Sequence, residues 1–543
     1  MISASSSELA ALRNRFPTSD DQLSPEAKQL VDGSSGRLFG PYALCLSGGG
    51  LRATFFHLGV IRALRRLDRF KGLTHIFSVS GGSILAAHLA LNWQKYTGTD
   101  QEFEKACCEI KEIGSRDIRN NIVRRWLLAL IFPPLWVKMH EFGPTRLLEQ
   151  EYQKALFRKK TFLDVYEADR TEPRRALKPN DAEPTIDLTE VSDADQKIRP
   201  VPDLQILATS FKTGNLCSFS RKGFCVEDKK SRRLYRTNVL PLSLAVAASS
   251  AYPPICPPVT ITRADLGEED GPDFPYPSES LTDGGLFDNL GFEQFLRNKA
   301  HDPDTPTDLV LSDAGAAFRW RTQESFWWII RRALRATDIL TKRVADQTLQ
   351  ISKGLQSSFR IAHIRIDEQI DDRPLGRLPI VLQKRLPRVR TDMDIFSSLE
   401  ISLLERHAYG VCEVIFPKNG LEMPPTEYQM DPAPSASLSE WISQTARVLD
   451  RSARRRYSLV NFKDGAFYGL LVWCFVLLLA AISPLLITTI QIKLLRSQLA
   501  DATQAYRASQ AAADAANADK AAAIARAQEL EQQLRDREKN PMK

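Results

Sequence analysis

The sequence predicts an α/β protein with a mostly parallel central sheet, followed by one membrane-spanning helix. Two apolar runs, at 42–46 and 73–79, each end at a glycine turn, and a helical pattern follows each turn. A strand, a glycine turn and a helix, twice in succession, are typical of an α/β unit with parallel strands. The third observation is the stretch 465–492, which contains no Asp, Glu, Lys or Arg. At about 1.5 Å per residue, such a helix is longer than the roughly 30 Å apolar thickness of a bilayer.

Length and composition limit the class of protein only broadly. The chain has 543 residues, more than one hydrophobic core usually holds, so two or more structural units are expected. A formal net charge of +7 does not by itself identify a partner. The eight cysteines form no Cys-x-x-Cys pair and no histidine cluster accompanies them, so a zinc site is not expected. They are typical of buried thiols in a reducing compartment.

Changes in composition divide the chain into five expected segments. These are a flexible polar leader at 1–38, a folded α/β domain at 39–423, a linker and basic juxtamembrane segment at 424–464, a transmembrane helix at 465–492, and an Ala-rich helical tail at 493–543. Inside the folded domain, 167–202 is charged, dotted with prolines and without a period, which favours a disordered surface insertion.

The apolar stretch predicts a single-pass membrane protein, with a buried core helix as the alternative. More basic residues precede the stretch than follow it, which favours a cytoplasmic location for the domain before it. The N-terminus lacks the basic start and apolar run of a secretory signal, in agreement with that orientation. A bacterial inner membrane is the expected location. The tail is a strong helix former with a weak heptad pattern, so a coiled coil that joins copies of the chain and a solvated single helix both stay open.

A candidate nucleophile lies where the second strand turns into its helix. Residues 78–82 read Ser-Val-Ser-Gly-Gly, with Ser80 at the centre. A nucleophile on such a turn is exposed, and it needs small neighbours two positions before and after it. Gly82 meets this need and Gly81 adds room, whereas Ser78 stands where a glycine is usual but is still small. Ser80 is therefore the candidate nucleophile, and an ordinary structural turn with an incidental serine is the alternative.

A candidate partner for this serine is a carboxylate about two hundred residues downstream. None of the seven histidines lies in an obvious catalytic loop, whereas Asp283 ends an ordered stretch and is followed by Gly284 and Gly285. The two glycines let the backbone approach another loop closely. An aspartate acts as a base only if burial raises its pKa toward the working pH. Asp-Gly-Gly alone is also an ordinary turn.

The first glycine turn predicts an anion-binding concavity. Gly48, Gly49 and Gly50 precede a helix, so backbone N–H groups and the helix dipole would favour negative charge there. Both a phosphate cradle and an oxyanion hole fit this pattern. The Gly-Lys-Ser/Thr of a Walker loop and the Gly-x-Gly-x-x-Gly of a dinucleotide site are not found here, and Ser80 favours the oxyanion hole. For Arg52, loop support and contact with a lipid phosphate both stay open.

These three motifs, in this order, resemble the oxyanion loop, nucleophile elbow and Asp-Gly-Gly of patatin-like phospholipases, as in a bacterial, membrane-anchored member. Residues 207–209 and 247–254 also look like the family, and the resemblance covers roughly 40–415. It implies a three-layer α/β/α sandwich, a Ser80–Asp283 dyad, no metal or other cofactor, and hydrolysis of lipid acyl esters. Gly81, Gly82, Gly284, Gly285 and Arg52 would support the loops or the substrate.

The expected partners are a membrane phospholipid as substrate and the lipid bilayer, with no nucleic acid. The apolar stretches 126–137 and 326–330, both flanked by basic residues, favour contact with a membrane surface, although core helices would give the same pattern. Three readings of the activity follow: a phospholipase, a lysophospholipase or neutral-lipid esterase with the same dyad, and a membrane scaffold that has lost activity.

Overall fold

The computed structural model consists of two compact units, Met1–Ala466 and Phe467–Lys543, which are described separately. It describes residues 40–132, 143–167, 200–227, 232–253, 256–267, 278–315, 329–354, 358–373, 377–421, 438–454, 460–462 and 464–539. The expected leader, nearly all of the insertion at 167–202, and Phe326–Trp328 lie outside these residues.

The first unit is built on a mixed sheet, in which the described residues form ten strands. Its parallel part has the order β10 (Arg360–Arg365), β9 (Asp308–Asp313), β1 (Tyr42–Leu46), β2 (Leu73–Val79) and β3 (Asp203–Ser210). The antiparallel part comprises β4 (Leu216–Ser220), β5 (Gly223–Glu227), β6 (Arg232–Tyr235), β7 (Val259–Thr262) and β8 (Ser278–Asp283). The predicted parallel arrangement therefore holds from β10 to β3. Beyond β3 the connections to β4 and β5 are hairpin turns, which are too short for the crossover that parallel strands require.

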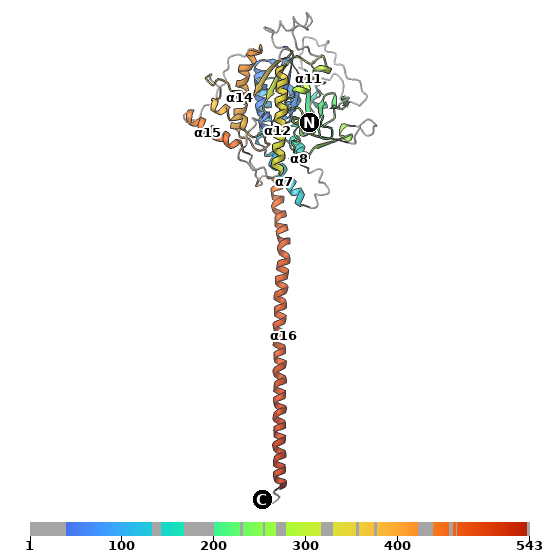
Figure 1. Ribbon diagram of the computed structural model, residues 1–543, viewed down its shortest axis with the longest axis vertical. Helices are drawn as coiled ribbons and strands as arrows, with labels where there is room; N and C mark the ends of the chain where they lie inside the picture. Colours follow the sequence, from blue (N-terminus) through green and yellow to red (C-terminus); the bar gives the residue numbers. More distant parts are fainter. Residues whose placement is uncertain are drawn as a thin grey trace. The chain divides into compact units, whose positions relative to one another are not determined.

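Helices cover both faces of the parallel strands, as Figure 1 shows. Tyr42, Leu44 and Leu46 of β1 belong to a core that includes α3 (Gly50–Arg66), α4 (Gly81–Leu91) and α14 (Ser398–Lys418). The alternate residues Ala43 and Cys45 belong to a second core with α11 (Phe292–His301). Strands that are apolar on both faces are typical of sheets covered on both sides. This arrangement confirms the predicted α/β/α layers.

The remaining helices of this unit surround the sheet. They are α5 (Trp93–Thr97), α6 (Asp100–Glu112), α7 (Ile118–Ile131), α8 (Pro144–Tyr152), α9 (Phe162–Val165), α10 (Leu242–Ser249), α12 (Ile329–Gly354), α13 (Ile380–Gln383) and α15 (Leu438–Ser452), with short 3₁₀ or π turns η2 (Arg69–Gly72), η3 (Ile113–Ser115), η5 (Gln153–Phe157), η7 (Ala264–Leu266), η8 (Gly284–Leu286) and η9 (Leu386–Arg388).

Part of the expected linker at 424–464 belongs to the folded unit. Residues 438–452 form α15, which packs against α13 and η9. Ala446 and Leu449 are buried, because the helix is amphipathic and turns its small apolar stripe inward. The sequence pattern indicates a linker here because the surrounding residues are rich in charge and proline.

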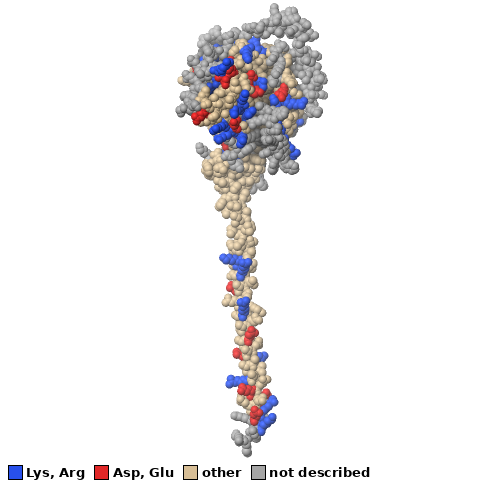
Figure 2. All heavy atoms as spheres, turned by 60° about the vertical axis from the view of Figure 1, so that its left-hand side comes forward, with Lys and Arg blue, Asp and Glu red and all other residues tan. Residues whose placement is uncertain are grey.

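The second unit is described by one helix, α16 (Gly465–Lys539). By length and composition alone it can cross a membrane, with a mean hydropathy of 2.8 over its most apolar window. Large apolar side chains such as Leu471, Val472 and Phe475 are at least half exposed along it. Figure 2 shows that charged residues of both signs appear only on its later part. Association of copies through this later part stays a prediction.

Candidate active site

The candidate nucleophile Ser80 lies on a sharp turn between β2 and α4. Its backbone has φ 49° and ψ −119°, a region that non-glycine residues rarely occupy. Such strained residues persist only when the surroundings hold them in place. Ser80 is the N-cap of α4, yet its hydroxyl makes no capping bond. The hydroxyl is therefore free to face Asp283, while the positive end of the helix favours negative charge on its oxygen.

The turn after Ser80 packs directly on the first glycine loop. A Cβ on Gly81 would collide with the carbonyl oxygen of Gly50, and one on Gly82 would collide with that of Leu46. Thr54 of α3 adds a hydrogen bond, since its hydroxyl donates to the Gly81 carbonyl at 2.7 Å. The two glycines are thus required by close approach of two backbones.

The serine that replaces the usual first glycine of the motif is accommodated in the sheet. Ser78 is fully buried in β2. Its hydroxyl donates to the carbonyl of Gln205 in the neighbouring strand β3 at 3.3 Å. Because the polar group is satisfied, the departure from glycine carries no burial penalty.

Asp283 ends β8 and meets Ser80 at the carboxyl end of β2. The Ser80 hydroxyl interacts with the Asp283 carboxylate and lowers its pKa, and the Gly285 N–H donates a hydrogen bond to Oδ1 of the same carboxylate at 2.7 Å. Asp283 is only 4% exposed, and this burial raises its pKa to about 6, although the Gly285 N–H and the Ser80 hydroxyl lower it. A carboxylate with this pKa can act as a general base near neutral pH.

The Asp-Gly-Gly turn is held in place by the residues after it. Gly284 packs against the Leu207 carbonyl of β3, where a Cβ would not fit. Asp288 is fully buried and accepts backbone N–H bonds that begin α11, including that of Gly291 at 2.9 Å. The carbonyl of Asn289 then accepts the N–H of Gly48 at 3.0 Å, which joins this turn to the first glycine loop.

The first glycine loop offers its remaining N–H groups beside Ser80. Gly49 is the N-cap of α3 with φ 142°, and Gly50 is the first helical residue with φ 58°. N–H groups at a helix N-terminus have no intrahelical partner. A Cβ on Gly48 would lie 3.4 Å from the Cβ of Ser80, so the loop borders the nucleophile. The Gly48 N–H donates to the Asn289 carbonyl, so of the three expected oxyanion donors this one is already used inside the protein.

Arg52 fixes this loop from the inside. The side chain is 1% exposed, and its guanidinium donates to the carbonyls of Ala314 at 2.6 Å, Val389 at 3.0 Å and Pro387 at 3.1 Å. A buried group directed at three backbone carbonyls is a loop support, and it is not directed at a lipid phosphate.

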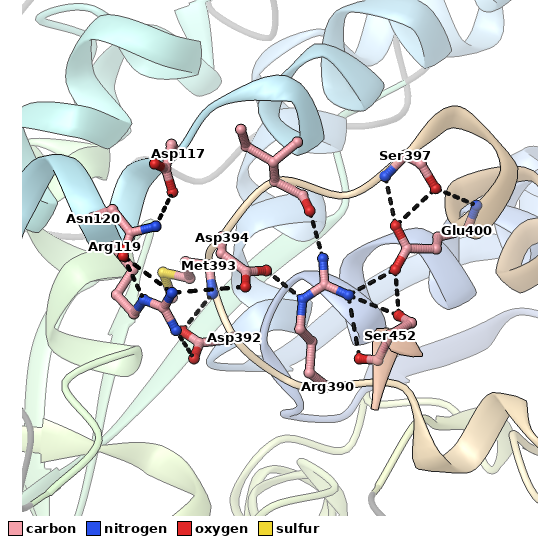
Figure 3. Close-up of polar contacts among 11 residues, drawn as sticks. Asp117, Arg119, Asn120, Arg390, Asp392, Met393, Asp394, Ser397, Glu400 and Ser452 are labelled. Carbon is pink, nitrogen blue, oxygen red and sulfur yellow. Dashed lines mark hydrogen bonds and ion pairs between the residues drawn. The ribbon is translucent and has the colours of Figure 1, made fainter. Parts of the chain in front are cut away.

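The segment 387–396 that Arg52 holds is itself fixed by an ionic cluster, drawn in Figure 3. Arg390 donates to Asp394, to Glu400 at the start of α14 (2.6 Å) and to the Ser452 hydroxyl at the end of α15 (2.7 Å). Arg119 of α7 pairs with Asp392 at 2.5 Å. The carbonyl of Thr391 packs on Gly50, where a Cβ would collide with it.

His57 of α3 is held in the core by two hydrogen bonds. His57 lies between the Ser312 hydroxyl (2.6 Å) and the Ser47 carbonyl (2.9 Å), and burial lowers its pKa to about 4. His57 is therefore neutral, and each of its ring nitrogens has a hydrogen-bond partner. Within the described ranges, no group of three His, Cys, Asp or Glu side chains is placed to hold a metal ion.

Sequence reasoning missed three residues that support the site. Asn289 and Arg390 gave no signal, because each acts through contacts with residues far away in sequence. Ser249, whose hydroxyl accepts the N–H of Ser80 at 2.8 Å, lies in the family-like stretch 247–254, but no role was inferred for it.

The fold is an α/β/α sandwich, and it brings Ser80 and Asp283 together at the carboxyl end of β2. The family model of patatin-like phospholipases matches residues 44–296, within which Ser80 and Asp283 both lie. This match supports lipid acyl hydrolysis as an activity of residues 44–296.

Comparison with solved structures finds similar chains, and comparison with curated proteins finds no match. Human GIVD cytosolic phospholipase A2 is 11% identical with a TM-score of 0.37, over 83% of this chain and 68% of that one. In complex with methyl γ-linolenyl fluorophosphonate, it gives 12% identity and a TM-score of 0.40, over 83% and 65%. VipD from Legionella pneumophila is 13% identical with a TM-score of 0.28, over 70% and 67%. The chain thus spans about two thirds of the length of these proteins.

Proposed function

We propose that this chain is a membrane-anchored serine hydrolase that cleaves acyl esters of membrane phospholipids, with Ser80 as nucleophile and Asp283 as base. The observation that carries the proposal is the interaction of the Ser80 hydroxyl with a buried carboxylate whose pKa is raised to about 6. A Ser80 oxygen on a strained turn, a base in contact with it and a row of helix-terminal N–H groups are the three parts that acyl transfer requires.

The reaction takes place in two halves. As the Ser80 oxygen attacks the ester carbonyl, its proton passes to Asp283, and the oxyanion accepts hydrogen bonds from the N–H groups of Gly49 and Gly50. The ester C–O bond then breaks, and the leaving alcohol takes the proton from Asp283. In the second half, Asp283 removes a proton from water, the water oxygen attacks the acyl-Ser80 ester, and the fatty acid leaves as Ser80 recovers its proton.

The proposed membrane anchor is the apolar first part of α16. Leu485 and Ile490 are 67% and 65% exposed, and a run of such side chains is stable in lipid and unfavourable in water. The basic residues before the apolar stretch outnumber those after it, which favours a cytoplasmic catalytic domain, as at a bacterial inner membrane. A membrane-held enzyme meets glycerophospholipid at high local concentration, so this is the favoured substrate.

The chemistry is tested by labelling with a fluorophosphonate probe, which reacts with activated serines. The full chain in detergent is expected to be labelled at one site, and the Ser80→Ala variant is expected to lose the label. Ser243→Ala, which removes a buried hydroxyl that has no hydrogen-bond partner among the described residues, is the matched control and should keep it. Labelling of Ser80→Ala at the wild-type rate would rule out the proposed nucleophile. A panel of phospholipid, lysophospholipid and triacylglycerol then assigns the substrate class.

The anchor is tested by ending the chain after Asp464. The full chain is expected to stay in membranes after alkaline carbonate washing, whereas the shortened chain is expected in the supernatant with its labelling intact. Release of the full chain by carbonate would argue against a membrane span. The cut must follow α15, because removing Ser452 would remove a partner of Arg390.

A further inference from the structure

The backbone N–H of Ser80 is used by a side chain from another element. It donates to the Ser249 hydroxyl oxygen at 2.8 Å. Ser249 is the last residue of α10 and is fully buried. A positive φ at Ser80 costs free energy unless neighbouring groups hold it, and this hydrogen bond is directed at the strained residue itself.

Ser249 belongs to a chain of hydroxyls that fixes which lone pair faces Ser80. The Ser83 hydroxyl donates to that of Ser78 at 3.2 Å, and Ser78 donates to a carbonyl of β3. Ser83 also lies 3.0 Å from the Ser249 hydroxyl. A hydroxyl has one proton, and that of Ser83 is already directed at Ser78, so Ser249 must donate to Ser83. The free lone pairs of Ser249 are then left for the N–H of Ser80.

The same turn also holds the other half of the dyad. Two residues after Ser249, the carbonyl of Ala251 accepts the N–H of Asp283 at 3.1 Å and the Thr282 hydroxyl at 2.7 Å. One three-residue stretch therefore binds the backbone of Ser80 on one side and the backbone of Asp283 on the other.

We propose that residues 249–251 are a bracket that sets the distance between Ser80 and Asp283, with Ser249 as the positioning residue for the nucleophile. Ser249 does not touch substrate: it acts by keeping Ser80 on its strained turn, with its hydroxyl directed at the carboxylate. The inference rests on the proposed Ser80–Asp283 dyad. It adds a residue whose loss weakens the acylation step and leaves substrate binding unchanged.

The test is the rate of fluorophosphonate labelling in the full chain, resolved into the limiting rate constant kinact and the half-saturating probe concentration. Ser249→Ala is expected to lower kinact by about 10- to 100-fold, since a small displacement of a reacting group has effects of this size. The half-saturating concentration should stay within about twofold. Ser249→Thr, which keeps the hydroxyl oxygen, should recover most of kinact.

The matched control is Ser243→Ala in the same helix. Ser243 is as buried as Ser249, but among the described residues its hydroxyl has no hydrogen-bond partner. Its substitution should leave kinact unchanged. If Ser249→Ala is recovered only unfolded, Ser249→Cys takes its place with the same expected loss, because a thiol of similar shape is a weak acceptor.

Two results would overturn the bracket. One is a folded Ser249→Ala or Ser249→Cys variant with kinact within twofold of wild type, and the other is an equal loss in Ser243→Ala. Failure of the dyad itself is recognised separately, because Ser80→Ala would then still be labelled at the wild-type rate.

Discussion

The polar groups around Ser80 are mostly neutral, whereas those around Arg390 are mostly charged. The first network consists of neutral hydroxyls and backbone groups, with Asp283 as the carboxylate in contact with the nucleophile. The second consists of guanidinium groups paired with carboxylates, as Figure 3 shows. Both are buried, and they are linked through the segment 387–396 that rests on the glycine loop.

The difference shows that the protein keeps the residues that make the loop rigid away from the carboxylate that acts as the proposed base. Among the described residues, the pKa of Asp283 is shifted by burial, the Gly285 N–H and the Ser80 hydroxyl, and none of these is a cation. An arginine beside Asp283 would stabilise the ionised carboxylate and lower its pKa, which would weaken the base. The ionic cluster holds the loop from a distance, where its paired charges leave the pKa of Asp283 raised.

Asp283→Asn should give the largest effect, because it removes the base and retains the shape. Hydrolysis is expected to fall by roughly 10²- to 10⁴-fold, the usual contribution of a general base. The free energy of unfolding at pH 7 should rise on the order of 1–3 kcal/mol, since a buried carboxylate with a pKa near 6 is ionised there at a cost. Substrate turnover and chemical denaturation measure the two effects.

The outcome that would contradict this comparison is a lower stability for Asp283→Asn. It would mean that the carboxylate stabilises the fold as the Arg390 cluster does, and that its pKa is not raised.

Arg390→Met tests the ionic side of the comparison. Its removal leaves Glu400 buried without this cation and leaves Asp394 with the longer pair to Arg119 at 3.7 Å. Breaking a buried pair in this way costs about 3–5 kcal/mol. The matched control is Arg385→Met, which removes an arginine five positions earlier from a half-exposed pair with Asp450 and should cost about 0–1 kcal/mol. Unfolding in urea measures both, and equal losses would show that the cluster adds no stability of its own.

The parts of this architecture that sequence could predict are those encoded locally. The strand–glycine–helix units around Gly48 and Ser80 carry their own apolar runs and turn residues, and the structure has both with the predicted boundaries to within a few residues. The antiparallel strands after β3 were not predicted, because short hairpins there leave no periodic signal of their pairing partner.

The supports of the site could not be predicted for a related reason. Arg390 binds the start of α14 and the end of α15, and Ser249 contacts Ser80 although the two lie 169 positions apart in the sequence. Such residues have no local pattern, since their role depends on which elements pack together. The same holds for Arg52, whose two alternative roles were separated only by its burial and by the carbonyls around it.

The pH profile of acylation gives the smallest effect and tests the neutral side of the comparison directly. Because Asp283 must be ionised to accept the proton of Ser80, labelling should rise with pH through a midpoint near 6 and be about tenfold slower at pH 5 than at its plateau. Stability should move in the opposite direction. The folded state binds the Asp283 proton more tightly than the unfolded state, whose carboxyl has its ordinary pKa near 3.8. The contribution of this group to stability therefore falls as pH rises from about 4 to 6.

The difference between wild type and Asp283→Asn isolates this one group from the other carboxylates. It should be near zero at pH 3.5 and should grow to its full value by pH 7. A labelling midpoint near 4 would show that Asp283 has an ordinary pKa despite its burial. The lack of a cation beside Asp283 among the described residues would then have no effect on its pKa. The contrast with the Arg390 cluster would no longer explain why this carboxylate acts as a base.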